Sequence, residues 1–152
     1  LMRARAGRDG DWVVEGIAEY YSMALLRRSE TITANRYEAA IESVRESASQ
    51  GGDLRTAKVD SATRAKAIVV MIEIDEAIRS STGGDRGLDD VVQLLTDRRK
   101  KITTRSFRKA VRETAGRDLS EIFDRVVAPD PAARVDLEST SGSRPVENSV
   151  PG

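Results

Sequence analysis

The sequence contains no cysteine and no histidine. Without cysteine the chain can form no disulfide, no thiol nucleophile and no cysteine-ligated metal site. Histidine is the commonest metal ligand and the usual general base near neutral pH. Its absence excludes a Ser-His-Asp or Cys-His catalytic site built from this chain alone. If the chain belongs to such a site, we expect it to supply only part of one.

The chain also lacks an excess of charge and a long apolar run. Lys and Arg number 25, Asp and Glu number 25, and the net charge is zero. Proteins dedicated to nucleic acids or membrane surfaces usually carry a basic excess, so we predict no nucleic-acid partner. The densest apolar stretch, AIVVMIEI, contains a Glu and is far shorter than the roughly 20 residues that cross a bilayer. We therefore predict no membrane span.

The apolar residues that are present recur at helical spacing almost throughout. Apolar positions at i, i+3, i+4 and i+7 predict helices over residues 11–28, 33–48, 61–82, 88–95, 104–116 and 118–127. In the first helix we expect Asp11 to cap the start and one face to be apolar: Val14, Ile17, Ala18, Tyr21, Ala24 and Leu25. We expect Thr33 and Thr104 to cap the second and fifth helices, and Gly116 to end the fifth.

The segment over residues 61–82 is ambiguous in composition. Its β-branched residues suit a buried strand, but its length far exceeds that of a usual strand. Asp75 and Arg79 also have the i, i+4 spacing of a helical ion pair. We therefore expect a helix that is apolar on most sides and lies at the centre of the core.

These segments predict an all-α domain of about six helices, packed as an orthogonal or irregular bundle over residues 10–128. Residues 1–9 form an N-terminal lead-in. Residues 129–152 hold all four prolines and no aromatic residue, so they cannot bury enough apolar surface to offset the entropy of ordering. We expect them to form a flexible tail.

One local motif stands out in the first helix, where Glu15 directly precedes Gly16 within WVVEGIAEYYS. Glycine inside a helix costs about 1 kcal/mol relative to alanine, which suggests that something closely approaches the backbone here. The simpler alternative is that Glu15 and Glu19 are exposed carboxylates near a helix start, where the helix dipole favours negative charge. The spacing of the residues leaves both interpretations open.

This segment resembles the W-x-x-E-G-x-x-x-Y segment of gluzincin metallopeptidases, the group of aminopeptidase N and bacterial glycyl aminopeptidases. Two downstream segments extend the resemblance. AKAIVVMIEIDEAIRSSTGGDRGLDDVVQLL is similar to their K-G stretch that ends in L-D-x-x-I-R and is followed by S-L-D-D-V. FRKAVRETAGRDLSEIFDRVV is similar to their closing helices. The three matches follow the family order over about residues 12–127.

The resemblance implies a zinc peptidase acting on peptide substrates. In that family two His of an HExxH helix and the Glu of the W-x-x-E-G segment hold zinc, and the HExxH Glu is the general base. The matching metal ligand here is Glu15. The family spacing between the second His and this Glu exceeds the fourteen residues that precede Glu15. We therefore expect the His ligands and the base upstream of residue 1, zinc only in the intact protein, and no activity in this chain alone.

Two positions depart from the family pattern. Arg64 stands where the family has the Tyr that stabilises the tetrahedral intermediate, and Ala67 stands at the Gly of K-G. Arg64 could place positive charge near an oxyanion, or be an ordinary surface residue of its helix. These departures leave open an alternative function, a non-catalytic helical interaction module that retains only the peptidase-like fold.

Without the HExxH helix, we expect the N-terminal helix to be partly uncovered at Trp12, Val13 and Ile17. An exposed apolar patch of this kind usually finds a partner, so we predict self-association through this helix or a partner chain there.

The last feature is a basic stretch, which consists of Arg98–Lys101 with Arg105, Arg108, Lys109 and Arg112. It could bind phosphates, but without interleaved aromatic residues we interpret it as a solvated loop and helix face.

Overall fold

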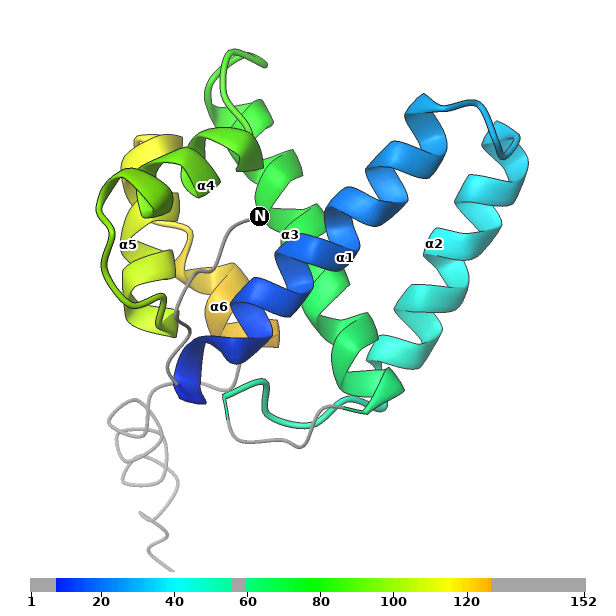
Figure 1. Ribbon diagram of the computed structural model, residues 1–152, viewed down its shortest axis with the longest axis horizontal. Helices are drawn as coiled ribbons and strands as arrows, with labels where there is room; N and C mark the ends of the chain where they lie inside the picture. Colours follow the sequence, from blue (N-terminus) through cyan, green and yellow to red (C-terminus); the bar gives the residue numbers. More distant parts are fainter. Residues whose placement is uncertain (1–7, 56–59, 127–152) are drawn as a thin grey trace, which may run out of the picture.

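The computed structural model describes residues 8–55 and 60–126, and within these ranges the chain is all-α (Figure 1). A short 3₁₀ turn precedes six α-helices: α1 (Asp11–Arg28), α2 (Ala34–Ala48), α3 (Ser61–Ser81), α4 (Leu88–Asp97), α5 (Thr104–Ala115) and α6 (Ser120–Val126). The predicted all-α class and the bundle of about six helices are therefore confirmed. The predicted tail, 129–152, and residues 1–7 of the predicted lead-in lie outside the described residues.

The centre of the fold is α3, as its composition predicts. Nine of its 21 residues are buried, including Val70, Met71, Ile74 and Ile78. Asp60 caps its start by accepting a hydrogen bond of 2.7 Å from the backbone N–H of Thr63. α1 and α2 pack against one part of α3, and α4 to α6 lie on the other side of the bundle (Figure 1). The choice of helix over strand for this segment is correct.

The first helix has the predicted bounds but a different buried face. Trp12, Val13 and Gly16 are buried, whereas Ala18 and Leu25 of the predicted apolar face are exposed. The face is rotated because the helix packs through Gly16, a residue that no hydrophobicity pattern counts as apolar. Asp11 is also not the cap: Gly10 occupies that position and provides no side-chain hydrogen bond.

The second helix has no fully buried residue. Its predicted apolar stripe does face α3, but only as half-buried side chains: Tyr37, Ala40, Ile41, Val44 and Ala48. Thr33 caps the helix as predicted, since its side chain accepts a hydrogen bond from the N–H of Arg36. α2 is thus a flanking helix held on one side only.

The remaining helices close the core around two phenylalanines. Phe107 of α5 contacts Trp12 and Phe123 edge-on, with ring centroids 5.7 and 5.9 Å apart. Gly116 ends α5 in the left-handed conformation, with φ of 70°, as predicted. The N-cap of α5 is Thr103, one residue before the predicted Thr104. None of the helices in the described ranges combines the length and apolar character that a bilayer crossing requires.

Two residues predicted to be uncovered are buried. Trp12 is only 4% exposed and Val13 is fully buried, because the start of α1 packs against α5 and the segment leading into it. The Trp12 indole N–H also donates a hydrogen bond of 2.8 Å to the hydroxyl of Thr104. Of the three predicted residues only Ile17 is partly exposed. The large apolar side chains that are exposed on this helix lie at its other end, at Leu25 and Leu26, which are 63% and 46% exposed.

Candidate functional site

The W-x-x-E-G motif forms the first two turns of α1, and packing accounts for two of its three defining residues. Trp12 anchors the helix to α5, as described above. Gly16 faces α3 so closely that a Cβ atom there would lie 3.0 Å from Met71 Cε and 3.2 Å from Ala67 Cβ. The close approach expected at this glycine is therefore made by α3. The motif residue that packing leaves unexplained is Glu15.

Glu15 is half-buried on α1, and its carboxylate forms no hydrogen bond or ion pair with the residues that the structure describes. Glu19, one turn further along the same side of the helix, is exposed. A carboxylate that no described residue engages is available to a cation. The same observation is compatible with a solvated residue near a helix start.

The residues present do not by themselves fit a zinc site. Zinc in catalytic sites takes three protein ligands, usually drawn from His, Cys, Asp and Glu. Across residues 8–55 and 60–126 no three side chains of these types lie close enough together to hold a metal ion, and the whole sequence lacks His and Cys. Among the described residues, Glu15 is thus at most a single ligand and does not complete a metal site.

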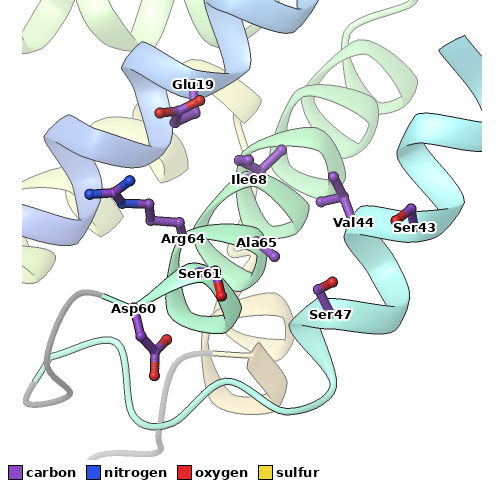
Figure 2. Close-up of a pocket in the computed structure, with 9 residues that line it drawn as sticks. All are labelled: Glu19, Ser43, Val44, Ser47, Asp60, Ser61, Arg64, Ala65 and Ile68. Carbon is purple, nitrogen blue, oxygen red and sulfur yellow. The ribbon is translucent and has the colours of Figure 1, made fainter.

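The two positions that depart from the family pattern lie on α3, beside α1. Ala67 is buried directly against Gly16, where an added Cβ atom would lie 3.2 Å from Ala67 Cβ. Arg64 is exposed, and its side chain extends from α3 toward α1 (Figure 2). Lys66, between them, donates a hydrogen bond of 2.8 Å to the carbonyl of Gly52, and burial lowers the pKa of its amine.

Arg64 and Glu19 line a groove of about 450 Å³ above the N-terminal half of α3, flanked by α1 and α2 (Figure 2). The α2 wall carries the hydroxyls of Ser43 and Ser47, and the apolar lining comes from Val44, Ala65 and Ile68. The groove thus has mixed character, with charges, hydroxyls and apolar side chains. Sequence reasoning did not predict it, because it depends on how α1 and α2 are placed on α3.

A second cluster, around Asp75, joins the middle of α3 to the start of α4. The buried carboxylate of Asp75 accepts hydrogen bonds from Arg79 Nε at 2.7 Å and from the backbone N–H of Leu88 at 2.8 Å. The predicted i, i+4 pair with Arg79 is confirmed, but the bond to Leu88 was not foreseen. Position 87 requires glycine, because a Cβ atom there would lie 2.8 Å from Asp75 Oδ1, which is too close for a side chain.

Two tyrosines of α1 extend this cluster. Tyr21 donates a hydrogen bond to Asp89, the second residue of α4. Burial raises the pKa of Tyr20, and the neighbouring carboxylate of Asp75 raises it further. For Tyr21, burial is again the main cause of a raised pKa, followed by the bond to Asp89. The cluster therefore ties α1, α3 and α4 together, and the tyrosines remain protonated at neutral pH.

The structure leaves most of the basic stretch in solvent. Arg98 pairs with Glu113, and Arg108 lies 3.6 Å from Asp124 and over the ring of Phe123. Arg105, Lys109 and Arg112 are exposed on the outer side of α5. This agrees with a solvated helix face.

No protein-family model, curated protein or solved structure matches this chain significantly.

Proposed function

We propose that the chain is the helical part of a gluzincin-like peptidase domain in which Glu15 supplies one carboxylate ligand to zinc. The remaining ligands and the general base come from an HExxH segment outside this chain. In the assembled protein the substrate is a peptide. The residues that the structure describes hold no metal site of their own, so no reaction step is assigned to them.

The observation that carries this proposal is the state of the W-x-x-E-G motif. Its Trp and Gly are fully used in packing, and they hold Glu15 near the start of α1 with a carboxylate that no described residue engages. A rigid helix that presents a carboxylate free of the described residues is an arrangement that suits a metal ligand. The direct contact of Gly16 with Ala67 further supports the resemblance, because it joins two segments that carry it independently.

The test is to express the chain together with whatever its reading frame encodes immediately upstream, and to measure zinc content and peptide hydrolysis. The proposal requires an HExxH sequence there. Glu15→Ala removes one of three protein ligands, so zinc affinity and hydrolysis should both be largely lost. The fold should remain, since a half-exposed carboxylate near a helix start contributes at most about 1 kcal/mol through the dipole.

Glu19→Ala is the matched control. It removes the same charge one turn along the same helix, but Glu19 matches no family ligand, so zinc content and hydrolysis should stay at the wild-type level. Equal effects of the two substitutions, or an upstream sequence without HExxH, would contradict the proposal.

The second candidate is a non-catalytic helical interaction module. It is favoured by the exposed end of α1, together with the absence of a metal-binding cluster among the described residues. With Trp12 and Val13 buried, self-association through this helix would have to use Leu25 and Leu26. Replacing both by serine should then abolish the association in light scattering. An unchanged molar mass, with the protein still folded, would remove this candidate interface.

A further inference from the structure

The neutral chain has a strongly uneven distribution of charge. Within residues 97–117, nine are Arg or Lys and two are Asp or Glu, so this stretch carries a net charge of +7. Because the whole chain is neutral, the other residues together carry −7. A charge of this size over one loop and one helix creates a local field that attracts anionic groups, whatever the net charge of the molecule.

The basic charge is concentrated on one face of α5. Phe107, Ala110 and Val111 point into the core, and helical geometry then places Arg105, Lys109 and Arg112 together on the outer side. All three are exposed, and among the described residues the ion pairs of this region engage only Arg98 and Arg108. We define the basic face as Arg105, Lys109 and Arg112.

An acidic row of similar length lies on α2. Glu38, Glu42 and Glu46 are spaced at i, i+4 and i+8, and all are exposed on the side of the helix that faces away from α3. Because an α-helix turns by about 100° per residue, the two arginines of this helix lie to either side of the row, at Arg36 and Arg45. We define the acidic face as Glu38, Glu42 and Glu46.

The two faces lie on opposite flanks of the molecule. In Figure 1, α5 and α2 are separated by α1 and α3. All six side chains of the two faces are exposed to solvent. The two faces of one copy therefore cannot neutralise each other. A second copy can, since its acidic face offers three carboxylates over the same number of helical turns as the three cations of the basic face.

We propose that the basic face of α5 binds the acidic face of α2 of a second copy, so that copies associate head to tail. A zero net charge supports this, because no overall repulsion keeps copies apart. A nucleic acid fits the basic face less well: both phenylalanines of the region are buried, so no ring is free to stack on a base, and the bulk of the chain is acidic. The proposal does not depend on the zinc site.

The association is weak and sensitive to salt. Exposed ion pairs contribute little individually and are screened over about 10 Å at 0.1 M salt. The contact is heterologous, with different surfaces on the two copies, so it extends to chains of copies unless the geometry closes a ring. We therefore expect the average mass in sedimentation velocity to rise with protein concentration at low salt and to return to the monomer value at high salt. An apolar contact through Leu25 and Leu26 would not weaken with salt.

Reversing the charge on either face provides the specific test. The triple variant Arg105→Glu/Lys109→Glu/Arg112→Glu carries two acidic faces, and the triple variant Glu38→Lys/Glu42→Lys/Glu46→Lys carries two basic ones. Each alone should remain monomeric at low salt. An equimolar mixture should associate again, because each face then meets a face of opposite charge. Circular dichroism of each variant verifies that the helices are retained.

The matched control reverses three exposed arginines outside both faces, Arg28, Arg64 and Arg86. It has the same net charge as the first variant and should associate more than that variant does. A wild-type chain that is monomeric at every concentration at low salt would overturn the proposal, as would a mixture that fails to associate. Binding of a short fluorescent RNA by a monomeric wild type, lost in the first variant, would assign the basic face to nucleic acid and also overturn the proposal.

Discussion

At the scale of single residues, the side chain of Asp75 joins α3 to the start of α4. Its carboxylate is buried, holds Arg79 and accepts the first N–H of α4. That N–H would otherwise be an unsatisfied donor at a buried helix start. The single side chain therefore fixes the position of α4 relative to α3, which hydrophobic packing alone would leave less well defined.

Asp75→Ala should destabilise the protein by about 2 to 3 kcal/mol, because it leaves a buried N–H unpaired and Arg79 without its partner. Asp75→Asn keeps an acceptor for Leu88 and should cost less. Urea unfolding followed by circular dichroism measures both. The control is Glu76→Ala, which removes an exposed carboxylate from the next position and should change stability by less than about 0.5 kcal/mol. A similar loss in both alanine variants would show that Asp75 has no special role.

Tyr20 and Tyr21 predict a dependence of stability on pH at the alkaline end. Burial, with help from the nearby carboxylates, raises the pKa of both hydroxyls in the folded state. As pH rises above about 10, the unfolded chain loses these protons first and binds fewer than the folded chain. Stability should therefore fall as pH increases above about 10.

The measurement is the midpoint of urea unfolding between pH 8 and 11. Tyr20→Phe/Tyr21→Phe should be less stable at pH 8, where two hydrogen-bonding groups are lost, but its midpoint should fall less steeply above pH 10. Parallel curves for the variant and the wild type would count against this assignment.

At the scale of elements, α3 and α2 differ in how firmly they are held. α3 buries nine residues and contacts α1, α2, α4, α5 and α6, whereas α2 buries none completely and is held by α3. Elements with few buried apolar contacts open locally at lower free energy than the core. α2 should thus be the least protected of the long helices.

Ile74→Ala, in the middle of α3, should cost about 3 to 4 kcal/mol, and Ile41→Ala, at the half-buried face of α2, about 1 kcal/mol. The same alanine substitution in two helices isolates the effect of burial. Hydrogen exchange should show faster exchange of α2 amides than of α3 amides in the wild type. Equal protection of the two helices would contradict this ranking.

The existence of each helix could be predicted from the sequence, because apolar spacing and chain breaks are local signals. The orientation of α1 could not be predicted, since its contact surface is built on Gly16 and depends on Ala67, about fifty positions away. The burial of Trp12 depends in the same way on α5. The caps of α1 and α5 each lie one residue before the predicted position. At α5 two adjacent threonines, Thr103 and Thr104, are equally suitable by type, and at α1 the N-cap is Gly10, which has no side chain to indicate it.

The candidate site was only partly predictable for the same reason. Glu15 could be singled out from its motif, and the pair of Asp75 with Arg79 from its helical spacing. The bond of Asp75 to Leu88 and the groove beside Arg64 are products of tertiary packing, which no local pattern encodes. Serine hydroxyls in that groove, such as Ser43, carry no sequence signal that distinguishes them from ordinary surface residues.

At the scale of the whole molecule, the ligands needed for a metal are absent from the described bundle. One carboxylate without His or Cys is a poor zinc ligand set, so the isolated chain should bind zinc no more tightly than an ordinary acidic surface does. Titration calorimetry with zinc chloride should detect no submicromolar site, and added zinc should not raise the thermal unfolding midpoint. A submicromolar site in this chain would show that the ligand set has been misidentified.

The contact between the start of α1 and the start of α5 has a consequence for how the protein folds. The backbone N–H of Thr104 donates a 3.1 Å hydrogen bond to the Asp9 carboxylate, and the Thr104 hydroxyl donates one of 2.8 Å to the Asp9 carbonyl, across 95 positions of sequence. Closing so long a loop is entropically costly, and such contacts slow folding. During synthesis α1 emerges before α5. Until α5 is made, Trp12 lacks its partners Phe107 and Thr104, so its ring is more exposed in the nascent chain and can promote aggregation.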